Sequence, residues 1–127
     1  MPVLTASEQG TIARAFADSS RLVVVSLCAA WCDTCTEFRA AYERLAQARP
    51  QATFVWLDIE DDAEIAGDID VENFPTLAIY RNGAPVHFGV SLPHETTVGR
   101  LVDALADTGS PLSDAPDEVA ELPEKFS

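Results

Sequence analysis

Blocks of apolar residues recur along the chain, and their spacing predicts strands and helices in alternation. Residues 22–27 are apolar except for Ser26, which is typical of a strand buried on both faces. Residues 53–59 have the same character. Between them, apolar residues repeat every three or four positions from 33 to about 49, which predicts an amphipathic helix that ends before Pro50.

A hairpin is predicted in the second half of the chain. Apolar residues 76–80 and 85–90 flank Asn82-Gly83, a pair that tolerates the positive φ angles of a tight two-residue turn. The remaining predicted elements are an edge strand at 3–4, a helix beginning after Ser7, a short helix around 63–66 and an amphipathic helix at 97–106.

This order of elements predicts an α/β fold with a mixed central sheet of four to five strands and helices on both faces. Alternating strands and helices favour parallel pairing in the first half, and the hairpin supplies an antiparallel edge. We assign residues 1–106 to one domain. Residues 107–127 are acidic and contain proline, so we expect a mostly disordered tail, although Val119, Leu122 and Phe126 offer apolar groups for docking.

Composition and charge narrow the classes of function. The chain has 127 residues, 47% of them hydrophobic, and a formal net charge of −13. That charge disfavours binding to nucleic acids and to anionic membranes, since both are polyanions. The sequence shows neither a basic-then-apolar leader nor an apolar run long enough for a membrane span, so we expect a cytoplasmic protein. We also expect a monomer. Three clustered cysteines are too few for a secreted disulfide framework.

The chemistry-bearing motif lies where the first buried strand meets the helix. It consists of Trp31, Cys32, Asp33, Thr34 and Cys35. Two cysteines three positions apart on a first helical turn can close a small reversible disulfide, and the helix N-terminus favours a thiolate at the first of them. The motif therefore predicts thiol–disulfide exchange.

Residues 3–106 resemble the thioredoxin family. Three segments carry the resemblance: the strand that runs into the motif at 30–35, residues 57–61 leading to Phe74-Pro75-Thr76, and the hairpin around 80–83. The resemblance implies a thioredoxin-like fold and a thiol–disulfide oxidoreductase without a bound cofactor. It also implies protein disulfides as substrates and a thioredoxin reductase as the electron donor.

The resemblance also implies roles for individual residues. Cys32 would attack a substrate disulfide, and Cys35 would resolve the mixed disulfide while Trp31 shields the sulfurs. Pro75 would be cis and lie against the disulfide. The backbone of Phe74 would then pair with an extended substrate segment.

The substrate groove is expected to be acidic. Thr76 flanks it together with Phe74, and residues 58–72 are rich in acids and contain no base. Asp33, Asp70 and Glu72 would ring the groove with negative charge and favour neutral or basic partner segments. An acidic face that is merely solvated fits the same pattern.

The chain departs from the family pattern at the cysteine motif and at a buried ionic pair. Asp33 and Thr34 replace the usual Gly-Pro between the cysteines. The family's buried aspartate and its partner lysine fall at Ser26 and Trp56. A serine hydroxyl does not ionise near neutral pH, so Ser26 cannot help to deprotonate the resolving cysteine. We therefore expect resolution of the mixed disulfide to be slow.

Cys28 leaves alternatives open. We interpret it as a buried, inert thiol at the end of the strand. Cys28, Cys32 and Cys35 also have the spacing of an iron–sulfur site, and His87 or His94 would complete a zinc site, although the single small domain argues against metal binding and we predict none. A further alternative is a thioredoxin-fold adaptor or folding helper with a vestigial or regulatory cysteine pair.

Overall fold

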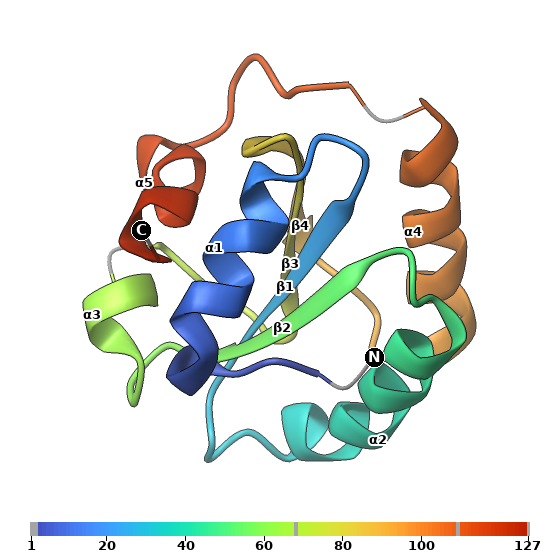
Figure 1. Cartoon of the computed structure of the whole chain (residues 1–127). Helices are drawn as coiled ribbons and strands as arrows, with labels where there is room; N and C mark the ends of the chain where they lie inside the picture. Colours follow the sequence, from blue (N-terminus) through green and yellow to red (C-terminus); the bar gives the residue numbers. More distant parts are fainter. Residues whose placement is uncertain (1–2, 68, 109, 127) are drawn as a thin grey trace.

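The computed structural model, which describes residues 3–67, 69–108 and 110–126, is built on a four-stranded mixed sheet in the order β2–β1–β3–β4 (Figure 1). β1 pairs in parallel with β2 and antiparallel with β3, and β3 pairs antiparallel with β4. The strands are β1 (Leu22–Cys28), β2 (Thr53–Asp58), β3 (Thr76–Arg81) and β4 (Ala84–Val90). The predicted mixed α/β sheet is therefore confirmed.

The two edges of the sheet compare differently with the expectations. Asn82 and Gly83 have φ angles of 54° and 76°, as the predicted two-residue turn between β3 and β4 requires. At the opposite edge, the expected strand at residues 3–4 is reduced to one parallel bridge from Leu4 to Val55.

β1 is the central strand, and all seven of its residues are buried. Because side chains alternate along a strand, β1 serves two separate cores. Val23, Val25 and Leu27 belong to the core on one face. Leu22 and Val24 belong to the core on the other face, and by the same alternation Ser26 and Cys28 also point there.

Helices cover both faces of the sheet (Figure 1). The core that contains Val23 is covered by α1, α3 and the C-terminal segment, and the core that contains Val24 by α2 and α4. The helices are η1 (Ala6–Glu8), α1 (Gln9–Ala17), α2 (Asp33–Ala48), α3 (Ala63–Ala66), α4 (Glu95–Thr108), α5 (Asp117–Ala120) and η2 (Leu122–Phe126), of which η1 and η2 are 3₁₀ helices.

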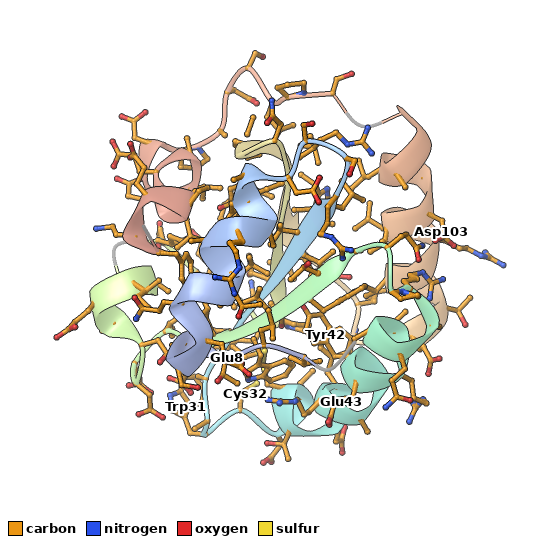
Figure 2. The ribbon with its side chains drawn as sticks, viewed as in Figure 1. Glu8, Trp31, Cys32, Tyr42, Glu43 and Asp103 are labelled. Atoms are coloured by element: carbon orange, nitrogen blue, oxygen red, sulfur yellow. A yellow bond between two sulfur atoms is a disulfide. The ribbon has the colours of Figure 1, made fainter. Side chains whose placement is uncertain are left out.

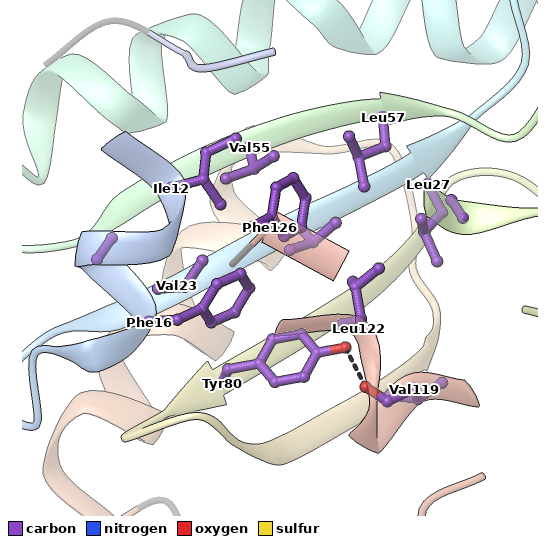
Figure 3. Close-up of a cluster of buried hydrophobic side chains, with 14 of the residues drawn as sticks. Ile12, Phe16, Val23, Leu27, Val55, Leu57, Tyr80, Val119, Leu122 and Phe126 are labelled. Atoms are coloured by element: carbon purple, nitrogen blue, oxygen red, sulfur yellow. Dashed lines mark hydrogen bonds between the residues drawn. The ribbon is translucent and has the colours of Figure 1, made fainter. Parts of the chain in front are cut away.

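The C-terminal segment corrects the expectation of a mostly disordered tail. α5 and η2 pack on the face that α1 covers, and Val119, Leu122 and Phe126 are buried there (Figure 3). The Phe126 ring lies 5.8 Å from that of Phe16, and the Tyr80 hydroxyl donates a 2.7 Å hydrogen bond to the Val119 carbonyl. The apolar residues at 119, 122 and 126 form a helical stripe, and its burial outweighs the acidic composition around it.

We predict that Leu122→Ala lowers the free energy of unfolding by about 3 kcal/mol, because it removes a fully buried side chain and leaves a cavity. Urea denaturation of the whole chain measures the change. Lys125→Ala, an exposed change in the same 3₁₀ helix, is the control. Equal losses in the two variants would contradict docking of this segment.

An ion pair ties the C-terminal end of α2 to α4. Arg49 donates hydrogen bonds of 3.0 and 3.1 Å to the two carboxylate oxygens of Asp103. These bonds from Arg49 hold the pKa of the Asp103 carboxyl below its usual value of 3.8. The pair therefore stabilises the fold above that value, and its contribution is lost as the pH falls through the lowered pKa.

We expect Asp103→Asn to reduce the free energy of unfolding at neutral pH by about 0.5 kcal/mol, since the carboxylate is largely solvent-exposed. Wild type and variant should converge as the pH falls well below 3.8. Urea denaturation in buffers across this range checks the prediction, with the exposed substitution Asp114→Asn as control. A gap that persists in acid would show that the pair is not its source.

Candidate active site

Cys32 is the N-cap residue of α2, at the end of the loop that leaves β1 (Figure 2). Its amide donates to the carbonyl of Ala29 at 3.0 Å, and its carbonyl accepts hydrogen bonds from both the amide and the hydroxyl of Thr36. The Cys32 thiol is free and partly exposed. The positive end of the helix dipole lies beside it.

The disulfide in the structure joins Cys28 to Cys35, and not Cys32 to Cys35. The two Cα atoms are 5.9 Å apart, within the range that a disulfide spans. Both cysteines are buried, with 0% and 1% of their surface exposed. The interpretation of Cys28 as an inert thiol is therefore wrong in this state of the protein. Cys28 is bonded to Cys35, the cysteine expected to resolve the mixed disulfide.

The sequence contained the signal for this pairing. Cys28 lies two residues after Ser26 on the face of β1 that α2 covers, because side chains alternate along the strand. Cys35 continues the apolar stripe of α2 that includes Phe38, Tyr42 and Leu45. Strand alternation and helix periodicity, read together, place the two sulfurs opposite each other.

Trp31 lies beside Cys32 and connects two loops. Its side chain is 66% exposed, and its ring meets the Phe74 ring edge-to-face with centroids 5.4 Å apart. Its indole N–H donates a hydrogen bond to the Glu60 carboxylate in the loop after β2. The Trp31–Phe74 contact brings residues 74–76 next to the cysteine loop. Of the other motif residues, Asp33 is exposed on the first turn of α2 and Thr34 is partly buried.

The loop before β3 contains the expected proline. The Phe74–Pro75 peptide bond is cis, and Pro75 is buried. The Pro75 carbonyl accepts a 2.9 Å hydrogen bond from the amide of Ser91, just past β4. Thr76 is 3% exposed, and its hydroxyl donates to the carbonyl of Asn73 at 2.7 Å. The end of the loop that leads into β3 is therefore held in place.

Two of the expected acidic groove residues share a cavity of about 280 Å³. Asp70 and Glu72 are exposed and line it together with Thr76. Its remaining lining residues come from β4 and the C-terminal segment: Phe88, Gly89, Val90 and Pro116. Asp33 is not among the lining residues and lies on α2, whereas Asp70 and Glu72 belong to the loop before β3.

A second cavity, of about 410 Å³, borders Cys35. Trp56 and Arg39 line it, with the Arg39 guanidinium 5.0 Å from the centre of the Trp56 ring. Ser26 pairs with Trp56 in the β1–β2 register, and the Ser26 hydroxyl lies 3.6 Å from the Cys28 sulfur. Ser26 and Trp56, which occupy the positions of the family's aspartate and lysine, are thus neighbours here and form no ion pair with each other.

Within the described ranges 3–67, 69–108 and 110–126, no group of three His, Cys, Asp or Glu side chains is placed to hold a metal ion. His87 is half-buried on β4, and this burial lowers its pKa. In the same part of the chain, none of the helices has the length and apolar character to cross a membrane.

Comparison with known proteins agrees with this fold. The thioredoxin family model matches residues 3–103. The chain is 34% identical over 89 residues to the thioredoxin of Chlamydia muridarum, covering 68% of this chain and 87% of that protein. It is 31% identical over 68 residues to the thioredoxin of Ophiophagus hannah, covering 54% of this chain and 65% of the relative. The X-ray structure of Fasciola hepatica thioredoxin superposes with a TM-score of 0.67 at 27% identity, covering 82% and 98% of the two chains.

The fold and the cysteine motif define an α/β protein of the thioredoxin type, with a helix N-terminus that presents a free thiol. Since the family model matches most of the chain, the protein belongs to the thioredoxin family. The chain spans just under two thirds of the length of the Ophiophagus relative. Family membership and a cysteine pair that forms a disulfide both support thiol–disulfide chemistry.

Proposed function

We propose that this protein is a thiol–disulfide oxidoreductase that reduces disulfides in other proteins. The observation that carries the proposal is the free thiol of Cys32 at the N-terminus of α2, three residues before a cysteine that already forms a disulfide. A thiolate at a helix N-terminus is the reactive form in disulfide exchange. Cys32 is the attacking group in this proposal.

The proposed reaction has two exchange steps. In the fully reduced protein, the Cys32 thiolate attacks one sulfur of a substrate disulfide, and the other substrate sulfur leaves as a thiolate. Cys35 then attacks Cys32, releases the reduced substrate and closes a Cys32–Cys35 disulfide. Because Ser26 replaces the family's aspartate, we expect this second step to be slow at neutral pH.

Recognition of the substrate is assigned to the loop around the cis peptide bond. The backbone of Phe74 is offered to an extended segment of the substrate, Trp31 covers one side of the sulfurs, and Pro75 shapes the groove. The donor of electrons is a reductase of the thioredoxin reductase type, and the expected place of action is the cytoplasm. No bound cofactor takes part in the proposed exchange.

Cys32→Ser is expected to abolish reduction of a model protein disulfide such as that of insulin, because the attacking sulfur is lost. Cys35→Ser should instead trap a covalent complex between Cys32 and the substrate, because the resolving thiol is lost. Turbidity follows insulin reduction, and non-reducing electrophoresis detects the trapped complex and its lifetime.

The control is Ala40→Ser, an exposed substitution on the same helix that leaves all three cysteines in place. If Cys32→Ser keeps full reductase activity, the proposed function is wrong. If the wild-type protein binds partners equally well with and without Cys32 and reduces none of them, the thioredoxin-fold adaptor is the better assignment.

The acidic cavity beside the β3 loop suggests a preference among partners. Replacing its two carboxylates, as Asp70→Asn and Glu72→Gln, should lower the association rate with a lysine-rich disulfide peptide about threefold at low salt. The difference should shrink at high salt because free ions screen exposed charges. Stopped-flow tryptophan fluorescence, to which Trp31 and Trp56 both contribute, is the measurement.

The pair Glu37→Gln and Glu43→Gln on α2 changes the net charge equally and serves as control. Equal association rates for wild type and the Asp70/Glu72 double variant at low salt would identify these acids as a solvated face without a role in recognition. The same double variant should show little change with a neutral disulfide peptide.

A further inference from the structure

The proposed exchange uses Cys32 and Cys35, yet the structure bonds Cys35 to Cys28. Cys28 is completely buried at the end of the central strand, and Ser26 is its hydroxyl neighbour. Cys35 is 1% exposed, whereas Cys32 is partly exposed and free. The oxidised protein thus keeps its accessible sulfur as a thiol and holds its disulfide inside.

Cys35 is placed to bond with either of two cysteines. Cys32 precedes it by three residues on the first turn of α2, and Cys28 faces it across the contact between β1 and α2. The two alternatives differ in accessibility. A Cys32–Cys35 disulfide presents one sulfur near the surface, and the Cys28–Cys35 disulfide presents none.

We propose that Cys28 is a third redox residue, which takes the disulfide from Cys32 and stores it in the interior. This proposal rests on the proposed function, because that function forms the Cys32–Cys35 disulfide from which the transfer starts. It adds an internal step: Cys35 changes partner, and Cys32 becomes a free thiol again while the protein remains oxidised.

The internal step needs no further oxidant or reductant. The Cys28 thiolate attacks the Cys35 sulfur, the Cys28–Cys35 bond forms, the Cys32–Cys35 bond breaks, and Cys32 leaves as a thiolate. One proton moves overall from Cys28 to Cys32, and the protein stays two electrons more oxidised than its three-thiol form. The reverse step returns the disulfide to Cys32, where an external thiol can attack it.

In this scheme, external thiols and disulfides therefore exchange with the protein only at Cys32. An external reductant cannot contact the buried sulfurs of Cys28 and Cys35, because thiol exchange requires access along the disulfide axis. Cys32 must first open the stored disulfide from within. While the disulfide is stored, the free Cys32 thiol has no resolving partner, so the protein pauses between turnovers.

The first test maps the cysteines in the oxidised wild-type protein. The three-thiol protein is oxidised by one equivalent of a disulfide substrate, the free thiols are blocked with iodoacetamide, and the remaining cysteines are reduced and labelled with N-ethylmaleimide before mass spectrometry. Blocked Cys32 with labelled Cys28 and Cys35 is the expected result. Blocked Cys28 with labelled Cys32 and Cys35 would overturn the proposal.

The second test measures how quickly the stored disulfide opens. Cys32→Ser, oxidised to its Cys28–Cys35 form, is treated with glutathione beside the oxidised wild type under conditions in which both stay folded by circular dichroism. We expect the variant to be reduced at least about tenfold more slowly. In guanidinium, where burial is lost, the two rates should agree. Equal rates in the folded proteins would contradict the proposal that reduction of the stored disulfide starts at Cys32.

These outcomes are separable from the proposed function. A wild-type protein that reduces insulin but accumulates the Cys32–Cys35 form retains the proposed function and loses the stored disulfide. A wild-type protein that reduces no disulfide when fully reduced loses the proposed function, and the substrate-driven route to Cys28 with it.

Discussion

The packing of α2 against the central strand β1 is the contact on which the rest of this molecule depends. β1 has a strand on each edge and helices on each face, so all of its side chains are buried and their alternation is strictly divided between two cores. One half of that alternation faces α2, whose inward stripe begins with Cys35 and continues through Phe38 and Tyr42. The same contact therefore builds one core and aligns two sulfur atoms.

This arrangement gives the three cysteines different environments. Cys32 lies at the N-terminus of α2 and is partly exposed to solvent, while Cys28 and Cys35 lie inside the contact between strand and helix. Reactivity of a cysteine follows its accessibility and its thiolate fraction. Residues 28–35 thus contain both an accessible thiol and a buried disulfide.

The opposite face of the sheet depends on residues far along the chain. α1 and α3 cover part of it, and the C-terminal helices supply Leu122 and Phe126 to complete its core. The Tyr80 hydroxyl, whose pKa burial raises above its usual value, donates a hydrogen bond to the carbonyl of Val119 and so satisfies a polar group inside that core. Pro116, just before α5, also lines the acidic cavity, so this segment contributes to the surface near the β3 loop.

Local patterns in the sequence determined the sheet, the helix that carries the motif and the Asn82-Gly83 turn, because each depends on periodicity or backbone preference within a few residues. They also determined that Cys32 begins a helix. Periodicity also places Cys28 and Cys35 on facing surfaces, but the docking of the C-terminal segment and the choice of Cys28 over Cys32 as the partner of Cys35 were decided only by the tertiary structure. Both depend on which surfaces meet across long sequence separations: the stripe at 119, 122 and 126 needed a hydrophobic face to cover, and Cys28 needed α2 above it. Composition reports the average polarity of a segment, and spacing reports the nearest cysteine, but packing decides which atoms touch.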